Sequence, residues 1–268
     1  MSITDSTSIV AENITKSFTT RYQRTAKQVA VAKMKGRKVS DRFDALHDVS
    51  FQIEQGESIG LMGLNGSGKS TLLKIINGVM APDSGSLRTR GRIFGLIATS
   101  AGFHPQLSGR ENIILNAAIL GMTEAETRRK FDEIVDFADI GNRLDTPVGH
   151  YSSGQSARLG FSVAVHADCD IFLADEVLAV GDRPFKRKCL KKMEEIRDSG
   201  RTLFYVSHAA GSVRRMCNRV LVLQDGHLAF DGDVDEGIKF LHYDDESDEA
   251  NEPDADEDDA DEELGADI

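Results

Sequence analysis

The sequence predicts an α/β protein built on a mostly parallel sheet, and three observations support this class. Short apolar runs alternate along the chain with segments whose apolar spacing is helical. The run at 58–64 passes directly into a glycine-rich loop and then into a helical pattern, which gives the order strand, loop, helix. Further apolar runs at 171–175, 202–207 and 220–224 are each followed by a loop or a helix start, as expected for parallel strands joined by crossovers.

Two other regions complete the expected order of elements. Residues 108–168 are predicted to form a helical insertion, because Ser108 precedes Glu111 and Thr123 precedes Glu126 at the spacing of capping boxes. Residues 225–233 are predicted to form a hairpin near the end of the folded part.

Charge divides the chain into a domain and a tail. The formal charge of the 268 residues is −12, but residues 244–268 hold 15 of the 44 acids and no base, which leaves 29 acids against 32 bases elsewhere. The tail has almost no apolar residues, so it cannot offset the entropy of ordering and is expected to be disordered. We therefore expect one domain over residues 1–243 and an acidic tail over 244–268.

A basic segment at about 21–42 interrupts what would otherwise be a short connection between two N-terminal strands. It is expected either to lie near an anionic membrane surface or to form a solvated loop. Its eight bases stand against Asp41 and are Arg21, Arg24, Lys27, Lys33, Lys35, Arg37, Lys38 and Arg42.

Several protein classes are disfavoured. The most apolar long stretch, residues 161–180, carries five ionisable groups, so the chain is not expected to cross a bilayer by itself. The first ten residues lack the basic and apolar regions of a secretion signal. Three cysteines without a CxxC pair support neither a disulfide framework nor a thiolate zinc site.

A phosphate-binding loop is predicted at residues 63–70, because GLNGSGKS fits the pattern G-x-x-x-x-G-K-[ST]. Its glycines allow backbone N–H groups to surround phosphate oxygens, and the following helix directs its positive end toward them. Lys69 is expected to reach the β and γ phosphates, and Ser70 to hold Mg²⁺. The candidate nucleotide-binding residues here are Gly63, Asn65, Gly66, Ser67, Gly68, Lys69, Ser70 and Thr71.

An acidic pair is expected to complete this site. The run at 171–175 ends in Asp175, a candidate ligand of Mg²⁺, and Glu176 beside it is a candidate general base for the attacking water. His208 follows the next apolar run, where its imidazole is expected to contact the γ-phosphate. These residues together predict an ATPase.

A second anion-binding helix start is predicted at residues 151–155, YSSGQ. One active site hardly needs two such helix ends, so this one is expected to serve the nucleotide of a neighbouring chain. The arrangement predicts a dimer.

With these motifs in this order, the chain resembles the nucleotide-binding subunit of an ABC transporter over about residues 9–243. The resemblance implies a P-loop NTPase cassette with a mixed sheet core, a helical subdomain and an N-terminal antiparallel β-subdomain. It also implies that Glu176 is the catalytic glutamate, that His208 is the switch histidine, and that Asp182 contacts nucleotide from the loop 180–182. Two cassettes of a homodimer would close head to tail around two MgATP, each bound also by Ser152, Gly154 and Gln155 of the partner.

The chain departs from the general family pattern at several positions. Ser153 stands where the usual signature has glycine, and Tyr151 replaces a leucine. The glutamine that the family carries near 98–100 is missing, and Thr99 is the nearest positional match. The aromatic residue that stacks on adenine is assigned to Phe18, with Tyr22 as the alternative.

Residues 101–112, 151–164 and 175–182 resemble the ATPases of bacterial exporters for lipid-linked polysaccharides such as O-antigen and teichoic acid. This resemblance implies two copies of the chain at the cytoplasmic face of the plasma membrane, bound as a peripheral subunit to two copies of an integral membrane permease. The cargo of the complex would be a lipid-linked polysaccharide.

Two other functions remain open. An exporter of drugs or peptides would share the cassette and differ only in the subfamily motifs. A soluble ABC-type ATPase acting on DNA or ribosomes is a weaker alternative, because the basic segment has few aromatic residues to stack on bases. No nucleic-acid partner is therefore expected.

Overall fold

The computed structural model describes residues 6–21, 40–96, 102–175 and 182–241. Its centre is a six-stranded sheet in the order β5-β6-β7-β3-β8-β9. The strands are β3 (Ser58–Met62), β5 (Ile93–Leu96), β6 (Ile171–Ala174), β7 (Thr202–Val206), β8 (Arg219–Gln224) and β9 (His227–Gly232). The first five in that order run parallel and β9 is antiparallel to β8, so the expected mixed sheet is confirmed.

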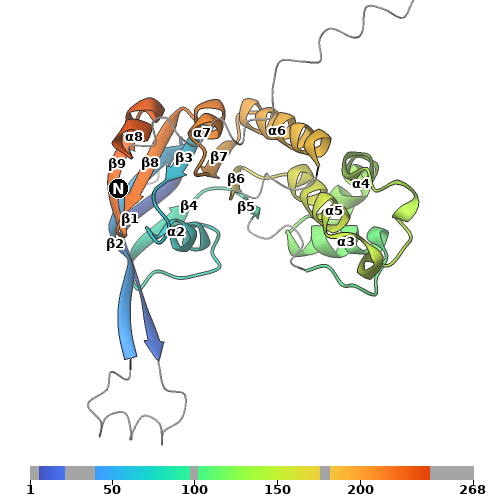
Figure 1. Ribbon diagram of the computed structural model, residues 1–268, viewed down its shortest axis with the longest axis horizontal. Helices are drawn as coiled ribbons and strands as arrows, with labels where there is room; N and C mark the ends of the chain where they lie inside the picture. The colour runs from blue at the N-terminus through green and yellow to red at the C-terminus, as the bar shows by residue number, and fades with distance from the viewer. Residues whose placement is uncertain (1–5, 22–39, 97–101, 176–181, 242–268) are drawn as a thin grey trace, which may run out of the picture.

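A second sheet is antiparallel, in the order β2-β1-β4, as the expected N-terminal β-subdomain requires. It consists of β1 (Thr7–Arg21), β2 (Ser40–Glu54) and β4 (Ser84–Thr89). The ladder between β1 and β2 continues to the pair Arg21 and Ser40, so the two ends of the basic segment belong to paired strands. Residues 22–39 lie outside the described residues. Figure 1 shows this hairpin projecting away from the rest of the molecule.

Seven α-helices are described, and three of them form a separate helical group after β5 (Figure 1). Ser108, Thr123 and Ser152 each cap a helix of this group in a capping box, with Glu111, Glu126 and Gln155 as the third residues. The helices are α2 (Lys69–Ile76), α3 (Gly109–Ile119), α4 (Glu124–Ala138), α5 (Ser153–His166), α6 (Arg183–Asp198), α7 (Ala210–Met216) and α8 (Val234–Phe240). Two 3₁₀ turns, Gly141–Arg143 and Val148–His150, connect α4 to α5.

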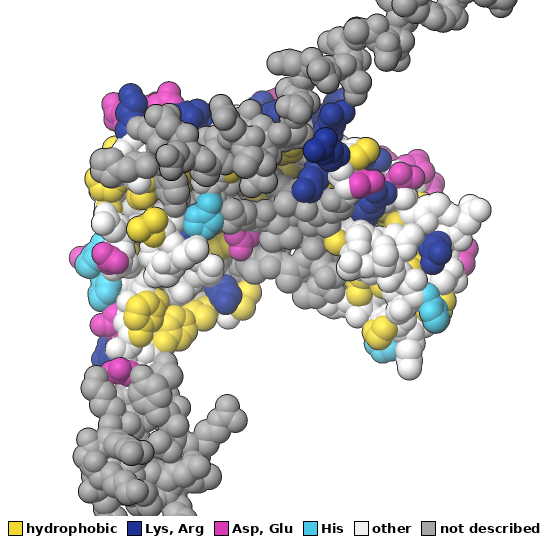
Figure 2. All heavy atoms as spheres, viewed as in Figure 1, with side chains coloured by type: hydrophobic (Ala, Val, Ile, Leu, Met, Phe, Trp, Pro, Cys, Tyr) yellow, Lys and Arg dark blue, Asp and Glu magenta, His cyan; other side chains and the backbone are white. Residues whose placement is uncertain are grey.

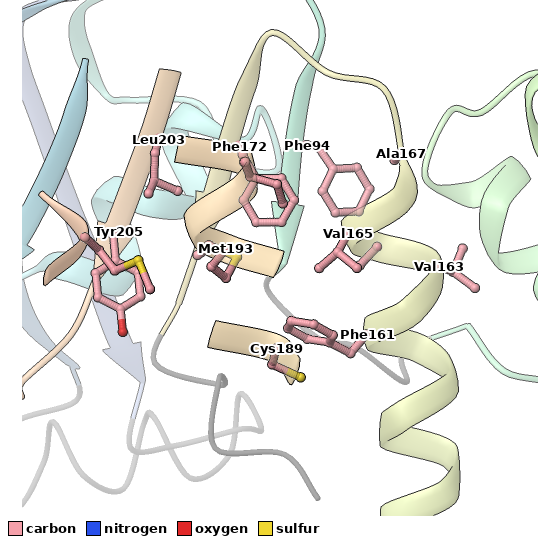
Figure 3. Close-up of a cluster of buried hydrophobic side chains, with 14 of the residues drawn as sticks. Phe94, Phe161, Val163, Val165, Ala167, Phe172, Cys189, Met193, Leu203 and Tyr205 are labelled. Atoms are coloured by element: carbon pink, nitrogen blue, oxygen red, sulfur yellow. The ribbon is translucent and has the colours of Figure 1, made fainter. Parts of the chain in front are cut away.

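Two apolar clusters cover the two faces of the central sheet. One packs α2 and the antiparallel sheet against residues such as Leu61 and Phe204. The other packs α5, α6 and α7 against Phe172 and Tyr205. Figure 3 shows side chains of α5 and α6 in this cluster. Because β3, β6 and β7 are buried along their whole length, their sequences are continuous apolar runs and not alternating ones.

No helix in the described part of the chain is long and apolar enough to span a membrane.

Candidate nucleotide-binding site

The loop between β3 and α2 has a backbone that only glycine adopts easily at its two ends. Gly63 has φ of 142°, and a Cβ there would lie 2.2 Å from the Leu223 carbonyl oxygen and 2.8 Å from Ser67 Oγ. Gly68 has φ of 107°, and a Cβ there would lie 2.5 Å from the Ala45 carbonyl oxygen. The glycines predicted from the sequence pattern thus allow the loop to pack closely on β8 and β2.

Lys69 begins α2 and turns its ammonium group back into this loop. Its Nζ donates to the carbonyl oxygens of Gly63 at 2.6 Å and Leu64 at 2.9 Å, and the residue is only 7% exposed. A buried cation is costly unless it is paired, so these carbonyls and other contacts hold the charge at the mouth of the helix. The charge therefore lies where an anion would meet the N-terminus of α2.

Ser67 provides an independent indication of a ligand. Its side chain is buried, at 4% exposure, and its Oγ has no hydrogen-bond partner among the described residues. A buried hydroxyl without a partner is rare, because it loses its bonds to water without replacement. A phosphate oxygen in the loop would be a suitable acceptor for this hydroxyl.

The loop opens onto a pocket of about 630 Å³ that joins three elements of the parallel sheet. Asp175 follows β6, His208 follows β7 and the loop follows β3, so all three lie at the carboxyl edge of the sheet. The residues lining the pocket are Phe43, Ala45, Asn65, Gly66, Gly68, Lys69, Ser70, Thr71, Asp175, Val206 and His208. The hydroxyl of Ser70 and the carboxylate of Asp175 are the oxygen ligands that Mg²⁺ prefers.

An aromatic residue in this lining was missed by the sequence analysis. Phe43 lines the pocket and is 57% exposed, whereas Phe18 is its direct cross-strand neighbour and does not belong to the lining residues named above. Lys16 Nζ lies 5.9 Å from the centroid of the Phe18 ring. Phe43 follows the basic segment in the sequence, and its pairing with Phe18 across the β1–β2 ladder positions it at the pocket. Phe43 is thus a third candidate for stacking on adenine.

The residues of the motif 151–155 lie at the start of α5, in the helical group and outside the pocket lining. Ser152 Oγ accepts from Gln155 N at 3.1 Å, and Gln155 Oε1 accepts from Ser152 N at 3.0 Å. A Cβ at Gly154 would meet only Ser152 Oγ, at 3.8 Å, so the backbone here is open to approach. This exposed helix start is available to a second molecule.

The contacts of Tyr151 explain why a tyrosine precedes α5 in this chain. Its hydroxyl donates to the Arg143 carbonyl oxygen at 2.6 Å, which ties the 3₁₀ turn to α5. A Cβ at Gly109 would lie 2.2 Å from the same hydroxyl oxygen. Burial raises the pKa of Tyr151, which opposes ionisation of the hydroxyl that donates this bond. Tyr151 and Gly109 therefore form a matched pair.

Asp182 caps α6 and connects it to α5. Its Oδ1 accepts from Phe185 N at 3.3 Å and from Arg158 Nη2 at 2.5 Å. Desolvation would raise the pKa of Asp182, but these hydrogen bonds outweigh it and the pKa lies below its usual range. Asp182 is thus held as an anion at the start of α6.

Several predicted residues lie outside the described residues. They are Glu176, Thr99 and Tyr22, together with residues 180 and 181.

The parallel central sheet and the glycine-rich loop between β3 and α2 define the class of P-loop NTPases. Comparison with known families matches residues 46–179 to the family described as ABC transporter. The chain belongs to the ABC transporter family.

Three relatives are 43–46% identical to this chain over the aligned residues. It is 46% identical over 191 residues to the ABC transporter protein AbcA of Aeromonas salmonicida, covering 71% of this chain and 62% of that protein. It is 43% identical over 195 residues to the O-antigen export system ATP-binding protein RfbB of Klebsiella pneumoniae, covering 73% and 78%. It is 44% identical over 200 residues to the teichoic acids export ATP-binding protein TagH of Bacillus anthracis, covering 75% and 36%.

The aligned part thus spans 62% of AbcA and 52% of the RfbB protein of Myxococcus xanthus.

Solved structures share the fold. An ATP-binding subunit of an ABC transporter matches with a TM-score of 0.68 at 22% identity, covering 88% of this chain and 93% of that one. A dimeric post-hydrolysis state of the ATP-binding cassette MJ0796, bound to ADP and Pi, matches with a TM-score of 0.65 at 22% identity, covering 84% and 98%.

Proposed function

We propose that this chain is the ATP-hydrolysing subunit of an ABC exporter that moves a lipid-linked polysaccharide across the plasma membrane for cell-envelope assembly. The observation that carries the proposal is the pocket that brings Lys69, Ser70, Asp175 and His208 together at one edge of the sheet. The relatives named for export of O-antigen and teichoic acids support the class of cargo.

The proposed chemistry assigns a role to each group in the pocket. Lys69 exchanges its two loop carbonyls for the β and γ phosphates, which develop charge during transfer. Ser70 and Asp175 would hold a magnesium ion, which would supply positive charge to offset that of the phosphates. Ser67 Oγ donates to a phosphate oxygen, and Phe43 or Phe18 stacks on adenine.

Hydrolysis needs a group that accepts a proton from water. In the proposal Glu176 takes this proton while the water oxygen attacks the γ-phosphorus and the bond to the ADP oxygen breaks. His208 lines the pocket and contacts the γ-phosphate, so its contact is lost with the product.

A second copy completes each site. Ser152, Gly154 and Gln155 at the exposed start of α5 would bind the γ-phosphate held by the partner, and Asp182 would lie beside them. Since one operation relates the copies of a homodimer, both sites are equivalent. The dimer would bind two copies of an integral membrane permease as a peripheral subunit on the cytoplasmic side.

Depletion of the chain in its native cell tests the cargo. Lipid-linked glycan should accumulate inside the cell and disappear from the surface while its synthesis initially continues. A plasmid-borne copy carrying Glu176→Gln should not restore export, whereas the matched surface change Glu195→Gln should restore it. Normal surface glycan after complete depletion, with loss of drug or peptide efflux, would overturn the proposed cargo.

A further inference from the structure

The N-terminal half of α6 carries a dense group of positive charge that the nucleotide site does not use. Residues 183–192 contain six bases and no acid. Figure 2 shows Lys and Arg side chains gathered where α6 lies in Figure 1. We call this surface the basic face of α6, and its residues are Arg183, Lys186, Arg187, Lys188, Lys191 and Lys192.

The helical period puts much of this charge on one exposed stripe. Phe185, Cys189, Met193 and Ile196 are buried and define the inner side of α6. Residues 183, 187 and 191 are spaced by four and are exposed, so they line the opposite side, flanked by residues 186 and 188.

This arrangement is unfavourable for the helix on its own. Like charges four residues apart repel, and bases in the first turns oppose the positive end of the helix dipole. Lys188 donates to the carbonyl oxygens of Asp136 and Phe137, and Lys192 pairs with Glu195 at 3.1 Å.

Three other bases of this face lack such compensation: Arg183, Lys186 and Lys191 form no ion pair with another described residue. Uncompensated charge of this density favours binding of an extended anion.

The chain contains a segment of matching charge. Residues 244–268 carry 15 acids and no base, and they follow α8 in the sequence. We propose that residues 244–268 bind the basic face of α6 within the same chain. Opposite charges of this number give strong attraction at low salt, and covalent linkage raises the local concentration of the segment to the millimolar range.

The helices between the two segments keep the path short. Arg214 of α7 pairs with Asp235 of α8 at 2.8 Å, and Arg215 of α7 pairs with Glu194 of α6 at 2.5 Å. Neighbouring helix axes lie about 8–10 Å apart, so α6 is roughly 20 Å from α8. A chain of 25 residues spans up to about 80–90 Å when fully extended, so residues 244–268 are long enough to reach the basic face.

The basic segment 21–42 is the other cationic surface that this acidic segment could bind. Figure 1 places the open end of the β1–β2 hairpin on the opposite side of the molecule from α8. A bound segment would have to cross the whole body to reach it. The distance therefore favours α6 over the basic segment.

Labelling of the full chain tests the proposal. A cysteine introduced by Ser247→Cys takes an uncharged dye selectively at pH 7, because burial raises the pKa of the Cys169 thiol to about 11 and those of Cys189 and Cys217 to about 12. Zero-length carbodiimide coupling, read by mass spectrometry, reports which lysines touch the carboxylates of 244–268 in the unlabelled chain.

At 20 mM NaCl, Lys186 and Lys191 should couple to residues 244–268, and the dye should show restricted rotation. Raising NaCl to 500 mM should cut this coupling by about tenfold, because the screening length shrinks to a few ångströms. The variant Arg183→Glu/Lys186→Glu/Lys191→Glu should free the dye at 20 mM NaCl, measured as a fall in anisotropy.

The matched variant Lys33→Glu/Lys35→Glu/Arg37→Glu reverses the same number of charges on the rival surface and should leave the anisotropy at its wild-type value. Release of the dye by this variant and not by the α6 variant would overturn the proposal. The proposal would also be overturned if the dye on the chain without charge-reversal substitutions had the same anisotropy at both salt concentrations and neither Lys186 nor Lys191 coupled to residues 244–268. The salt comparison needs no substitution on α6, so it holds even if the α6 variant folds poorly.

Discussion

Replacement of Lys69 by methionine should separate nucleotide binding from folding. Methionine keeps a long unbranched side chain and removes the ammonium group that donates to the carbonyl oxygens of Gly63 and Leu64. Leu64 is exposed, so water can replace the ammonium group at its carbonyl oxygen, whereas Gly63 is buried. The loss of these bonds is offset by the relief of desolvating a 7% exposed cation, and we expect stability without nucleotide to change by no more than about 1 kcal/mol.

The effect on nucleotide should be much larger. A charge-assisted contact to phosphate contributes about 3 kcal/mol, which is roughly a hundredfold in affinity. At an ATP concentration 100 times the wild-type Kd, ATP stabilises the wild-type chain by about 2.7 kcal/mol, which raises Tm by about 5–10 °C. For Lys69→Met the same ATP concentration equals the Kd of the variant. Stabilisation by ATP therefore falls to about 0.4 kcal/mol, and the Tm shift falls to about 1–2 °C.

Thermal unfolding with and without MgATP measures both quantities. Lys74→Met is the matched control, because Lys74 is an exposed base in the last turn of the same helix. It should keep the full Tm shift. If Lys69→Met also kept a shift of several degrees, the ammonium group in this loop would not be the phosphate ligand.

The remaining predictions address hydrolysis, packing and acid stability. Glu176→Gln should bind MgATP like the wild type but hydrolyse it at least about a hundredfold more slowly, since an amide cannot accept the proton from water; undiminished turnover at saturating MgATP would contradict the assignment. Tyr151→Phe should cost about 1 kcal/mol, and Gly109→Ala should cost less in that background than in the wild type, a coupling that a double-mutant cycle measures. Hydrogen bonds from Lys16, and then from Ser17, lower the pKa of Asp83 to about 2, below its ordinary 3.8. Its contribution to stability is thus present above about pH 4 and lost as pH falls toward 2. The urea unfolding midpoint should therefore fall less between pH 4 and pH 2 for Asp83→Asn than for the wild type.

The features that could be predicted from the sequence are encoded in short spacings. The glycine-rich loop, the capping boxes at Ser108 and Thr123, and the buried parallel strands each depend on residues within about ten positions of one another. Local geometry decides such features, so they do not require knowledge of distant partners.

The features that were missed depend on distant partners. The strand β4 (Ser84–Thr89) has the sequence SGSLRT, which has little apolar pattern, and it forms because β1 offers it a ladder. Phe43 reaches the pocket only through its pairing with Phe18 across the basic segment. In both cases tertiary pairing decides the structure, and no local signal precedes it.

The contact between the phosphate loop and the β8–β9 hairpin has a consequence for synthesis of the chain. Gly226 N donates to the Ser67 carbonyl oxygen at 3.1 Å, and the Leu223 carbonyl lies directly behind Gly63. β3 is also inserted between β7 and β8, both of which follow it by more than 130 residues. A ribosome therefore releases the loop long before the strands that shape it, and contacts of such separation form late in folding. ATP would therefore stabilise the fully synthesised and folded domain, and not a nascent chain that still lacks β7 and β8.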